Sequence, residues 1–357
     1  MINKDRSPLF LAITFLTIFI SFIGLLAIYN ASVIEGFNTF NDRFYFVKQQ
    51  FNWLVLGLAI YFLISRFDPS IYRRLALPLF CLSLVLMLMV LIPGIGLKLQ
   101  GARRWLSFGP IRFQPSELLK INLVLYLSLW FETKRNIKSF IAFVAFCLSL
   151  VMFQSDLGTS AIIASICLGM YYLSGASIKD VAIVIFSLVL GVTLLTLISP
   201  YRMQRLRTFV DPSLDTLGRS YHINQIVLGL GSGGMFGVGL GRSRQKYAYL
   251  PEATTDSIFA IIGEETGFIG GVFIIILLLS LCLLAFKVAG LTKNPHQRLI
   301  AAGIGLLFSA QTFVNLSSIV ALIPLTGVPL PLISYGGSAL ITNFISLGIL
   351  AGIARNL

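Results

Sequence analysis

The chain has 357 residues, of which 57% are hydrophobic and only 11% are charged. Soluble domains usually carry about 25% charged residues, so this composition excludes an ordinary soluble protein and indicates an integral membrane protein. The formal net charge is +13, which makes the placement of basic residues among the loops informative.

The cysteines and histidines exclude two classes of site. All four cysteines lie in apolar runs, which is typical of small buried hydrophobic residues rather than of a disulfide framework. His222 and His296 are too few and too far apart in the sequence to predict a metal site built on imidazole.

Apolar runs predict the membrane crossings. The first run is about 20 residues long with no small-residue cleavage site after it, which favours a membrane helix over a removed signal peptide. The runs lie at about 9–29, 50–66, 75–94, 116–132, 139–153, 157–175, 180–199, 257–286, 299–320 and 338–354. They predict an all-α polytopic membrane protein of about ten transmembrane helices. We expect a single domain over 1–357, with a large extracytoplasmic loop at about 200–255 between helices seven and eight.

The basic residues predict the orientation of the chain. With the N-terminus inside, the cytoplasmic segments carry thirteen lysines and arginines and the short outer loops carry six. This bias places both termini in the cytoplasm. The basic residues on the predicted outer face, including those of the long loop, gather mostly in stretches 98–112, 202–219 and 242–246. An anionic ligand on that face would account for them, and lipid headgroups are the alternative.

The segment GARRWLSFGPIRFQPSELLK brings four charged candidates together. Arg103 and Arg104 stand beside a tryptophan suited to the membrane interface, where they could bind an anionic substrate. Glu117 and Lys120 are spaced i,i+3 on the fourth helix, so they share one face. They either contribute to a substrate site or form an ion pair that locks the bundle.

Two further stretches flank later helices. Asp156 in QSDLGTS precedes the sixth run, where a carboxylate caps free N–H groups and complements the helix dipole. The segment PLTGVPLPLISYGGSAL, which contains Ser334 and Gly336, has too many prolines and glycines for a plain helix. It is either a loop framing a pocket, where Ser334 and Gly336 are candidate substrate-binding residues, or a simple connector.

The long outer loop holds a basic part and a glycine-rich part. Arg202 and Arg205 are candidate substrate-binding cations. Seven glycines between Gly229 and Gly241 permit close backbone approach, either to a ligand or to a neighbouring helix.

The stretch YLPEATTDSIFAIIGEETGFIGG places carboxylates at two depths. Asp256 lies at the outer mouth of the eighth crossing, where a general base could act on an outer-leaflet substrate. Glu264 lies roughly 12 Å deeper on nearly the same face. Glu264 and Glu265 are expected to set packing and charge balance, with a basic partner such as Lys120.

These motifs together resemble the SEDS family (shape, elongation, division and sporulation), which includes FtsW, RodA and SpoVE. The resemblance is carried by GARRW…QPSELLK, SDLGTS, GLGRSRQKYAYLPEATTDSIFAIIGEETGFIGG and PLTGVPLPLISYGGSAL, and it spans most of the chain. GLGRSRQKYAYLPE is closer to FtsW, whereas GVPLPLISYGGSA has some RodA character.

The resemblance implies a peptidoglycan glycan-strand polymerase acting on lipid II at the outer face of a bacterial cytoplasmic membrane. The family's essential acidic residue falls on Asp256. The implied reaction is an inverting transfer that forms a β-1,4 linkage, with Asp256 as base. Arginines of the outer loops would stabilise the diphosphate. A divalent cation, Mg²⁺ or Mn²⁺, is an open alternative near Asp256. Thr254 and Ser257 depart from the family pattern of His before Thr-Asp and Phe after it.

The implied partners are a class B penicillin-binding transpeptidase and other divisome or elongasome membrane proteins, with no nucleic acid. Two alternatives to the polymerase remain at this stage, namely a lipid II flippase and a non-enzymatic scaffold for cell-wall synthases. No inverted repeat is visible, which disfavours a secondary transporter.

Overall fold

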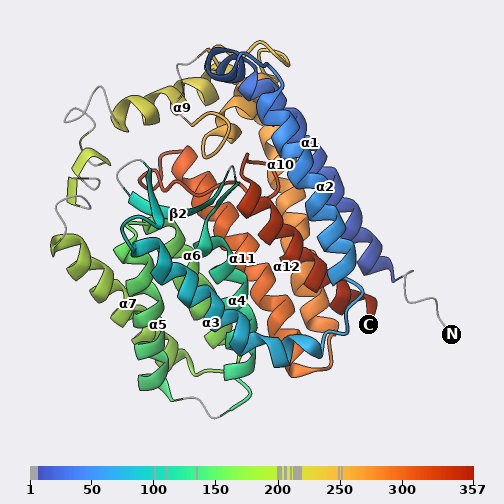
Figure 1. The fold of residues 1–357 in the computed structure, drawn as a ribbon, viewed down its shortest axis with the longest axis vertical. Helices are drawn as coiled ribbons and strands as arrows, with labels where there is room; N and C mark the ends of the chain where they lie inside the picture. The colour runs from blue at the N-terminus through green and yellow to red at the C-terminus, as the bar shows by residue number, and fades with distance from the viewer. Residues whose placement is uncertain are drawn as a thin grey trace.

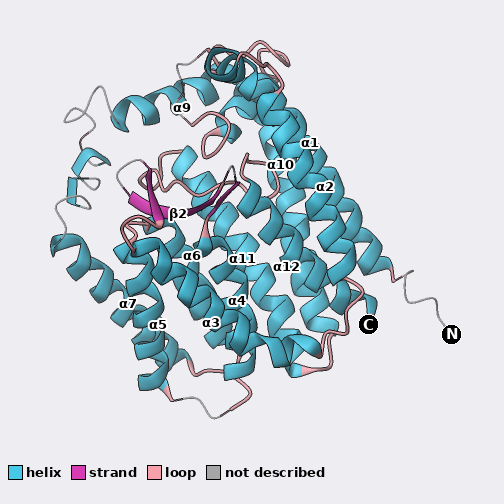
Figure 2. Cartoon of the chain, viewed as in Figure 1, coloured by secondary structure: helices cyan, strands magenta, loops and turns pink. Residues whose placement is uncertain are grey.

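The computed structural model describes residues 7–99, 102–109, 111–133, 136–198, 203–204, 207–209, 211, 219–247, 250 and 252–357. Arg202 and Arg205 lie outside the described residues. The described part is a helical bundle with one small sheet in its upper half (Figures 1 and 2).

Each of the ten predicted apolar runs coincides with a helix. These helices are α1 (Pro8–Phe40), α2 (Tyr45–Ile64), α3 (Ile71–Leu91), α4 (Pro115–Trp130), α5 (Ile137–Phe153), α6 (Leu157–Leu173), α7 (Ile178–Ile198), α10 (Ile258–Leu291), α11 (Pro295–Ile319) and α12 (Gly337–Arg355). Within the described residues, six of them are long and apolar enough to cross a membrane: α1, α2, α3, α10, α11 and α12. The number of crossings therefore stays a prediction, while the multi-pass character is clear.

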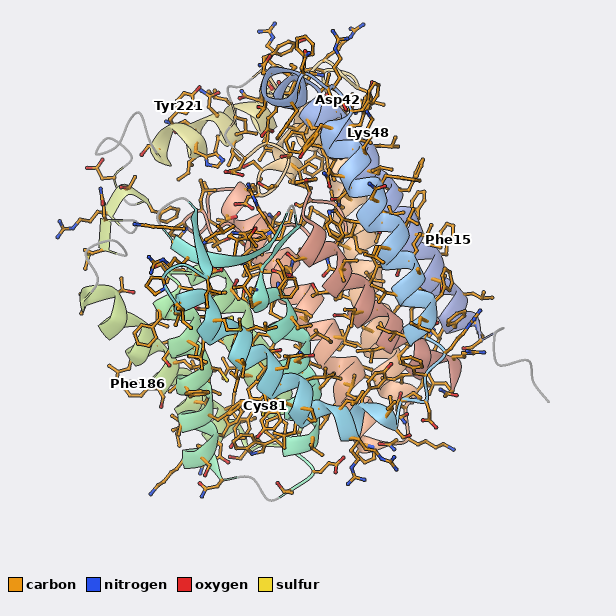
Figure 3. All side chains as sticks on the ribbon, in the orientation of Figure 1. Phe15, Asp42, Lys48, Cys81, Phe186 and Tyr221 are labelled. Carbon is orange, nitrogen blue, oxygen red and sulfur yellow. The ribbon has the colours of Figure 1, made fainter. Side chains whose placement is uncertain are left out.

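The buried fraction of each helix distinguishes those at the centre of the bundle from those at its periphery. In the apolar windows of α11 and α12, 67% and 78% of residues are buried, compared with 17% for α2. On the outer helices, Phe15 is 64% exposed and Phe186 68% exposed, and Figure 3 shows both on the sides of the bundle. Apolar surface on this scale is stable only against lipid.

The two ends of the described chain lie at the same end of the bundle. Ser7, just before α1, donates a hydrogen bond from Oγ to the carbonyl oxygen of Ala354 in α12, at 3.0 Å. The sheet and α9 (Arg219–Gly233) lie toward the opposite end (Figure 1). This arrangement agrees with an even number of crossings, and the side of the membrane stays a prediction.

The all-α prediction was wrong in one segment. The connection between α3 and α4 forms a three-stranded antiparallel sheet in the order β1-β2-β3, made of β1 (Gly96–Leu99), β2 (Ala102–Phe108) and β3 (Ile111–Phe113). The strands are three to seven residues long, too short for apolar runs to reveal. Pairing satisfies backbone groups that a helix would otherwise satisfy internally.

The glycine-rich part of the long loop is also more regular than predicted. Residues Arg219–Gly233 form α9, which packs on α10. After α9 the chain passes through φ values of 54, 84 and 102 at Gly234, Gly237 and Gly239, conformations that side chains with a Cβ rarely adopt.

Candidate active site

Asp256 lies in a turn that leads directly into α10. The carbonyl oxygen of Glu252 accepts hydrogen bonds from the N–H groups of Thr255 and Ser257, at 3.2 Å each. Glu252 itself has a φ of 51, which is uncommon for a residue other than glycine. From α9, His222 Nε2 lies 2.8 Å from Ser257 Oγ. Hydrogen bonds within the turn and a contact from α9 therefore hold its conformation.

Polar groups from distant parts of the chain fix the backbone of this turn. Three successive carbonyl groups accept hydrogen bonds: Thr254 from the Tyr335 N–H at 2.9 Å, Thr255 from Ser334 Oγ at 2.7 Å, and Asp256 from Asn315 Nδ2 at 3.0 Å. Because the bonds use main-chain oxygens, they position the Asp256 side chain without occupying it.

The connector between α11 and α12, residues 320–336, has no regular secondary structure and is held by buried polar side chains. Asn315 Nδ2 donates to the carbonyl oxygen of Val328 at 2.8 Å, and Gln311 Nε2 donates to that of Pro329 at 3.0 Å. The N–H of Leu330 donates to Ser334 Oγ at 2.8 Å. The connector therefore frames the Asp256 turn rather than only linking two helices.

A cavity of about 340 Å³ opens where these segments meet the sheet. Its lining includes Arg104, Gln114, Glu252, Asp256, Gly327, Tyr335 and Gly336. Three of the residues that the sequence predicts for the site, Arg104, Asp256 and Gly336, thus come together although they lie far apart in the chain.

Gly327 lies against the catalytic candidate. Its φ is 74, and a Cβ added there would lie 3.4 Å from Asp256 Oδ2. Glycine therefore allows the connector to take a left-handed conformation where its backbone passes close to the carboxylate.

A register shift in the sheet aims Arg104 at the cavity. Leu97 pairs with Trp105 and Lys98 pairs with Arg103, so Arg104 is an extra residue in β2. Such bulges redirect side chains and are common next to active sites. Arg104 and Trp105 both line the Asp256 cavity, whereas Arg103 lines a separate pocket with Lys98. The structure thus separates two arginines that the sequence grouped.

Arg104 is anchored by the turn between α5 and α6. Its Nε donates to the carbonyl oxygen of Gln154 at 3.1 Å, and its Nη2 donates to that of Ser155. Asp156, in the next position, is the N-cap of α6 and accepts a bond from the Thr159 N–H at 3.0 Å. The predicted capping position of Asp156 and the placement of Arg104 therefore depend on one turn.

Glu117 and Lys120 are buried beneath the site. Lys120 Nζ lies 2.8 Å from Glu117 Oε1 and 2.9 Å from Gln311 Oε1. The two side chains are 3% and 2% exposed and do not line the cavity. Since Gln311 also binds the connector at Pro329, this arrangement favours the ion-pair alternative over direct substrate contact.

Glu264 and Glu265 are buried as predicted, but the prediction of Lys120 as their partner was wrong. Glu264 accepts hydrogen bonds from Ser243 Oγ and from the Arg244 N–H, the latter at 3.0 Å. Glu265 Oε1 lies 3.5 Å from Lys246 Nζ. The loop before α10 folds back onto this helix and supplies these partners, and sequence spacing alone does not reveal such a return.

The same return decides what the glycine-rich run contacts. α10 is broken at Gly267, with φ 70 and ψ −168. Around the break, Val238 and Gly239 donate from N–H to the carbonyl oxygens of Glu264 and Glu265, and Phe268 and Ile269 donate to those of Gly234 and Met235. The run therefore supplies backbone partners to α10, which favours the helix-packing alternative over a phosphate loop.

Several site residues were not singled out from the sequence: Gln114, Glu252, Tyr335, Asn315, Gln311 and His222. Gln311 and Asn315, two amide side chains four positions apart in a mostly apolar run, were the available signal. Burial raises the pKa of Tyr335, and Tyr45 adds to the effect. Its phenol is therefore neutral at physiological pH, and Asp256 is the stronger base candidate.

Ser334, a predicted substrate-binding residue, is 5% exposed and uses its hydroxyl to join the connector to the Asp256 turn. These are the contacts of a residue that positions the turn. Gly336 lines the cavity and donates from its N–H to Gln50 Oε1 at 3.3 Å.

No three His, Cys, Asp or Glu side chains gather into a metal site within the described residues. Two carboxylates, Asp256 and Glu252, do line the cavity. One or two carboxylates together with substrate phosphates are what Mg²⁺ usually takes. The donor set therefore fits a cation that arrives with a diphosphate.

Comparisons with known proteins agree over nearly the whole chain. A family model described as cell cycle protein, FTSW_RODA_SPOVE, matches residues 10–357. Stage V sporulation protein E of Bacillus subtilis (strain 168) is 35% identical over 99% of this chain and 99% of its own. The probable peptidoglycan glycosyltransferase FtsW of Trichlorobacter lovleyi is 34% identical over 97% of this chain and 93% of its own.

Two solved structures share the fold. The rod shape determining protein RodA of Thermus thermophilus has a TM-score of 0.69 at 27% identity, covering 96% of both chains. A chain from the structure reported for polymerization and crosslinking by a peptidoglycan synthase complex has a TM-score of 0.79 at 27% identity, covering 96% of this chain and 97% of that one.

Proposed function

The chain belongs to the FtsW/RodA/SpoVE family of cell cycle proteins, and from this premise we propose that it is a peptidoglycan glycosyltransferase that polymerises glycan strands. The substrate is lipid II, a disaccharide-peptide carried on a polyprenyl diphosphate. The observation that supports the proposal most strongly is the shared cavity, which both Asp256 and Arg104 line.

Asp256 is the general base of this mechanism. It accepts the proton of the acceptor sugar 4-hydroxyl while the hydroxyl oxygen bonds to the anomeric carbon of the donor. The bond from that carbon to the diphosphate breaks in the same displacement, so the α configuration of the donor becomes a β-1,4 linkage. One base is sufficient for such an inversion, and no nucleophilic carboxylate is required.

Arg104 is the candidate for stabilising the leaving diphosphate. A guanidinium group matches phosphate oxygens in geometry and stays charged. Its bonds to Gln154 and Ser155 hold it in place before the substrate arrives, which is the condition for effective stabilisation of developing charge. A divalent cation held by Asp256 and Glu252 would add positive charge at the same diphosphate.

We place this site at the outer face of a bacterial cytoplasmic membrane, with both termini in the cytoplasm. The excess of lysines and arginines in the predicted cytoplasmic segments, thirteen against six in the short outer loops, supports this orientation. We further propose a class B penicillin-binding transpeptidase as partner, because a new glycan strand must be crosslinked where it emerges.

The test is polymerisation of purified lipid II by the full chain with its transpeptidase present, comparing wild type with Asp256→Asn. The substitution leaves the main-chain bonds of the turn in place, so the protein is expected to fold. Loss of a general base lowers the rate by about 10²–10⁴-fold. Asp42→Asn is the matched control, because Asp42 is a carboxylate outside the cavity that pairs with Lys48 (Figure 3).

Equal polymer from Asp256→Asn and wild type would remove Asp256 as base. If neither protein formed polymer and both moved lipid II between leaflets, the flippase would replace the polymerase.

A further inference from the structure

A second pocket lies beside β2 and is lined in part by Arg103, the neighbour of Arg104. Its volume is about 290 Å³, and its lining includes Leu91, Lys98, Arg103, Phe153, Gln154 and Ser155. It shares none of its lining with the Asp256 cavity, and the mechanism above does not use it.

The pocket concentrates uncompensated positive charge. Lys98 and Arg103 are cross-strand partners in β1 and β2, so their side chains stand next to each other on one face of the sheet. Like charges in that position destabilise a strand pair. Within the described part of the chain, neither residue belongs to an ion pair. A bound anion would remove the repulsion.

The surroundings of the pocket are apolar and exposed. Phe153, at the end of α5, is 74% exposed, and Leu88 and Ile92 at the end of α3 are 50% and 47% exposed. In a protein with this many apolar helices, such surface faces lipid. A ligand that fits both features has an anionic head for the two cations and a hydrocarbon chain for the helices.

We propose that Lys98 and Arg103 bind the phosphate of a membrane lipid, in a site separate from the Arg104 cavity. Two lipids have this chemistry, namely a polyprenyl diphosphate and an anionic phospholipid. The first rests on the proposed function, since the reaction joins two lipid-linked glycans, each carried on its own polyprenyl diphosphate, and Arg104 is assigned only to the diphosphate that leaves. The pocket then keeps the second lipid at the membrane surface.

One turn forms a wall between the two sites. Gln154 and Ser155 line the second pocket, and their carbonyl oxygens accept the hydrogen bonds of Arg104. The two sites therefore adjoin the same turn but have no lining residue in common, so an anion bound by Lys98 and Arg103 does not need the place of one bound by Arg104.

The experiment is a binding titration of the full chain in phosphatidylcholine nanodiscs. The probe is undecaprenyl diphosphate, and bound equivalents are counted by native mass spectrometry. We expect wild type to bind two equivalents and the Lys98→Gln/Arg103→Gln variant to bind one. The affinity for the second equivalent falls at least about tenfold, because a hydrogen bond to a charged group contributes that much or more.

The matched control is Arg43→Gln/Lys48→Gln, which removes the same charge from the same end of the bundle, away from the pocket. It is expected to bind two equivalents. If both double variants lose binding equally, nonspecific electrostatic attraction between the basic surface and the anionic lipid explains the result, and the proposed site is refuted. If neither loses an equivalent, the proposal is also overturned. Should the double variant fail to fold, Lys98→Gln alone decides, because Lys98 is exposed.

Competition with phosphatidylglycerol separates the two ligands. Displacement of the second equivalent identifies an anionic phospholipid site, and resistance to displacement identifies a polyprenyl diphosphate site. The result does not depend on catalysis. Asp256→Asn is expected to keep both equivalents, so a failure of the polymerase proposal would leave the binding counts interpretable.

Discussion

At the scale of single residues, the site depends on side chains that never face the cavity. Ser334 links the connector to the Asp256 turn through one hydroxyl, which donates to Thr255 and accepts from Leu330. Asn315 similarly joins the turn to Val328. Because these polar groups are buried, each needs its protein partner to complete its hydrogen bond.

Ser334→Ala is expected to destabilise the protein by about 1–3 kcal/mol, since a buried carbonyl and a buried N–H lose their partner. Polymerisation should fall with it, because the Asp256 turn loses one of its three fixing bonds. Thermal unfolding in detergent measures the first effect. Ser187→Ala is the control, because its hydroxyl is exposed and bonds only within α7. Equal unfolding temperatures for the two variants would contradict the positioning role.

The pH dependence of stability offers a second residue-scale prediction. Burial raises the pKa of Tyr335 above its ordinary value of 10.0, so folding favours the neutral phenol. The stabilisation is present below the unfolded pKa and is lost as the pH rises through the folded pKa. Unfolding temperatures of wild type and Tyr335→Phe should therefore differ more in favour of wild type at pH 8 than above pH 10. A constant difference would show that the phenol does not titrate with folding.

At the scale of elements, α9 and α10 contact each other through backbone. A Cβ added at Gly233 would overlap the carbonyl oxygen of Gly263, whereas one added at Gly231 would meet nothing within 4 Å. Gly233 therefore has no room for a side chain, whereas Gly231, two residues earlier in the same helix, does.

Gly233→Ala should separate α9 from α10 and lower both stability and polymerisation, since Ser257 next to Asp256 contacts α9 through His222. Gly231→Ala is expected to be neutral or slightly stabilising, because alanine favours the helix by about 1 kcal/mol over glycine. Unfolding temperature and polymer yield measure both variants. Equal losses would indicate that helix propensity rather than close packing is responsible.

At the scale of the whole molecule, one buried polar chain connects the bundle centre to the site. It runs from Glu117 through Lys120 and Gln311 to the carbonyl of Pro329. It thereby joins α4, α11 and the connector, three parts whose relative positions determine the cavity.

Lys120→Met should cost about 3–5 kcal/mol of unfolding free energy, because it leaves Glu117 as an unpaired buried charge. Adding Glu117→Leu removes that charge, and the double variant is expected to recover much of the loss. Denaturant unfolding of the two singles and the double gives the coupling between the residues. Additive losses would show that the pair does not act as a unit.

The sequence by itself determined the membrane class, the helical runs and the family. The length of an apolar run and the charge of a loop are local properties of the sequence, and the bilayer sets the same requirements on them in every membrane protein. The motifs around Arg104, Asp256 and Gly336 could also be recognised from the sequence, because the residues of each motif are contiguous in the chain. The comparisons confirmed the family over residues 10–357.

Only the tertiary structure decided which of these motifs meet. The bulge at Arg104 sends it to the Asp256 cavity and leaves Arg103 with Lys98, because strand register depends on the partner strand. Lys246 and the Ser243 turn, not Lys120, are the partners of the two buried glutamates, because the loop before α10 returns to a break in that helix. Such contacts join residues far apart in sequence, and the free energy that selects them exists only once the bundle is packed.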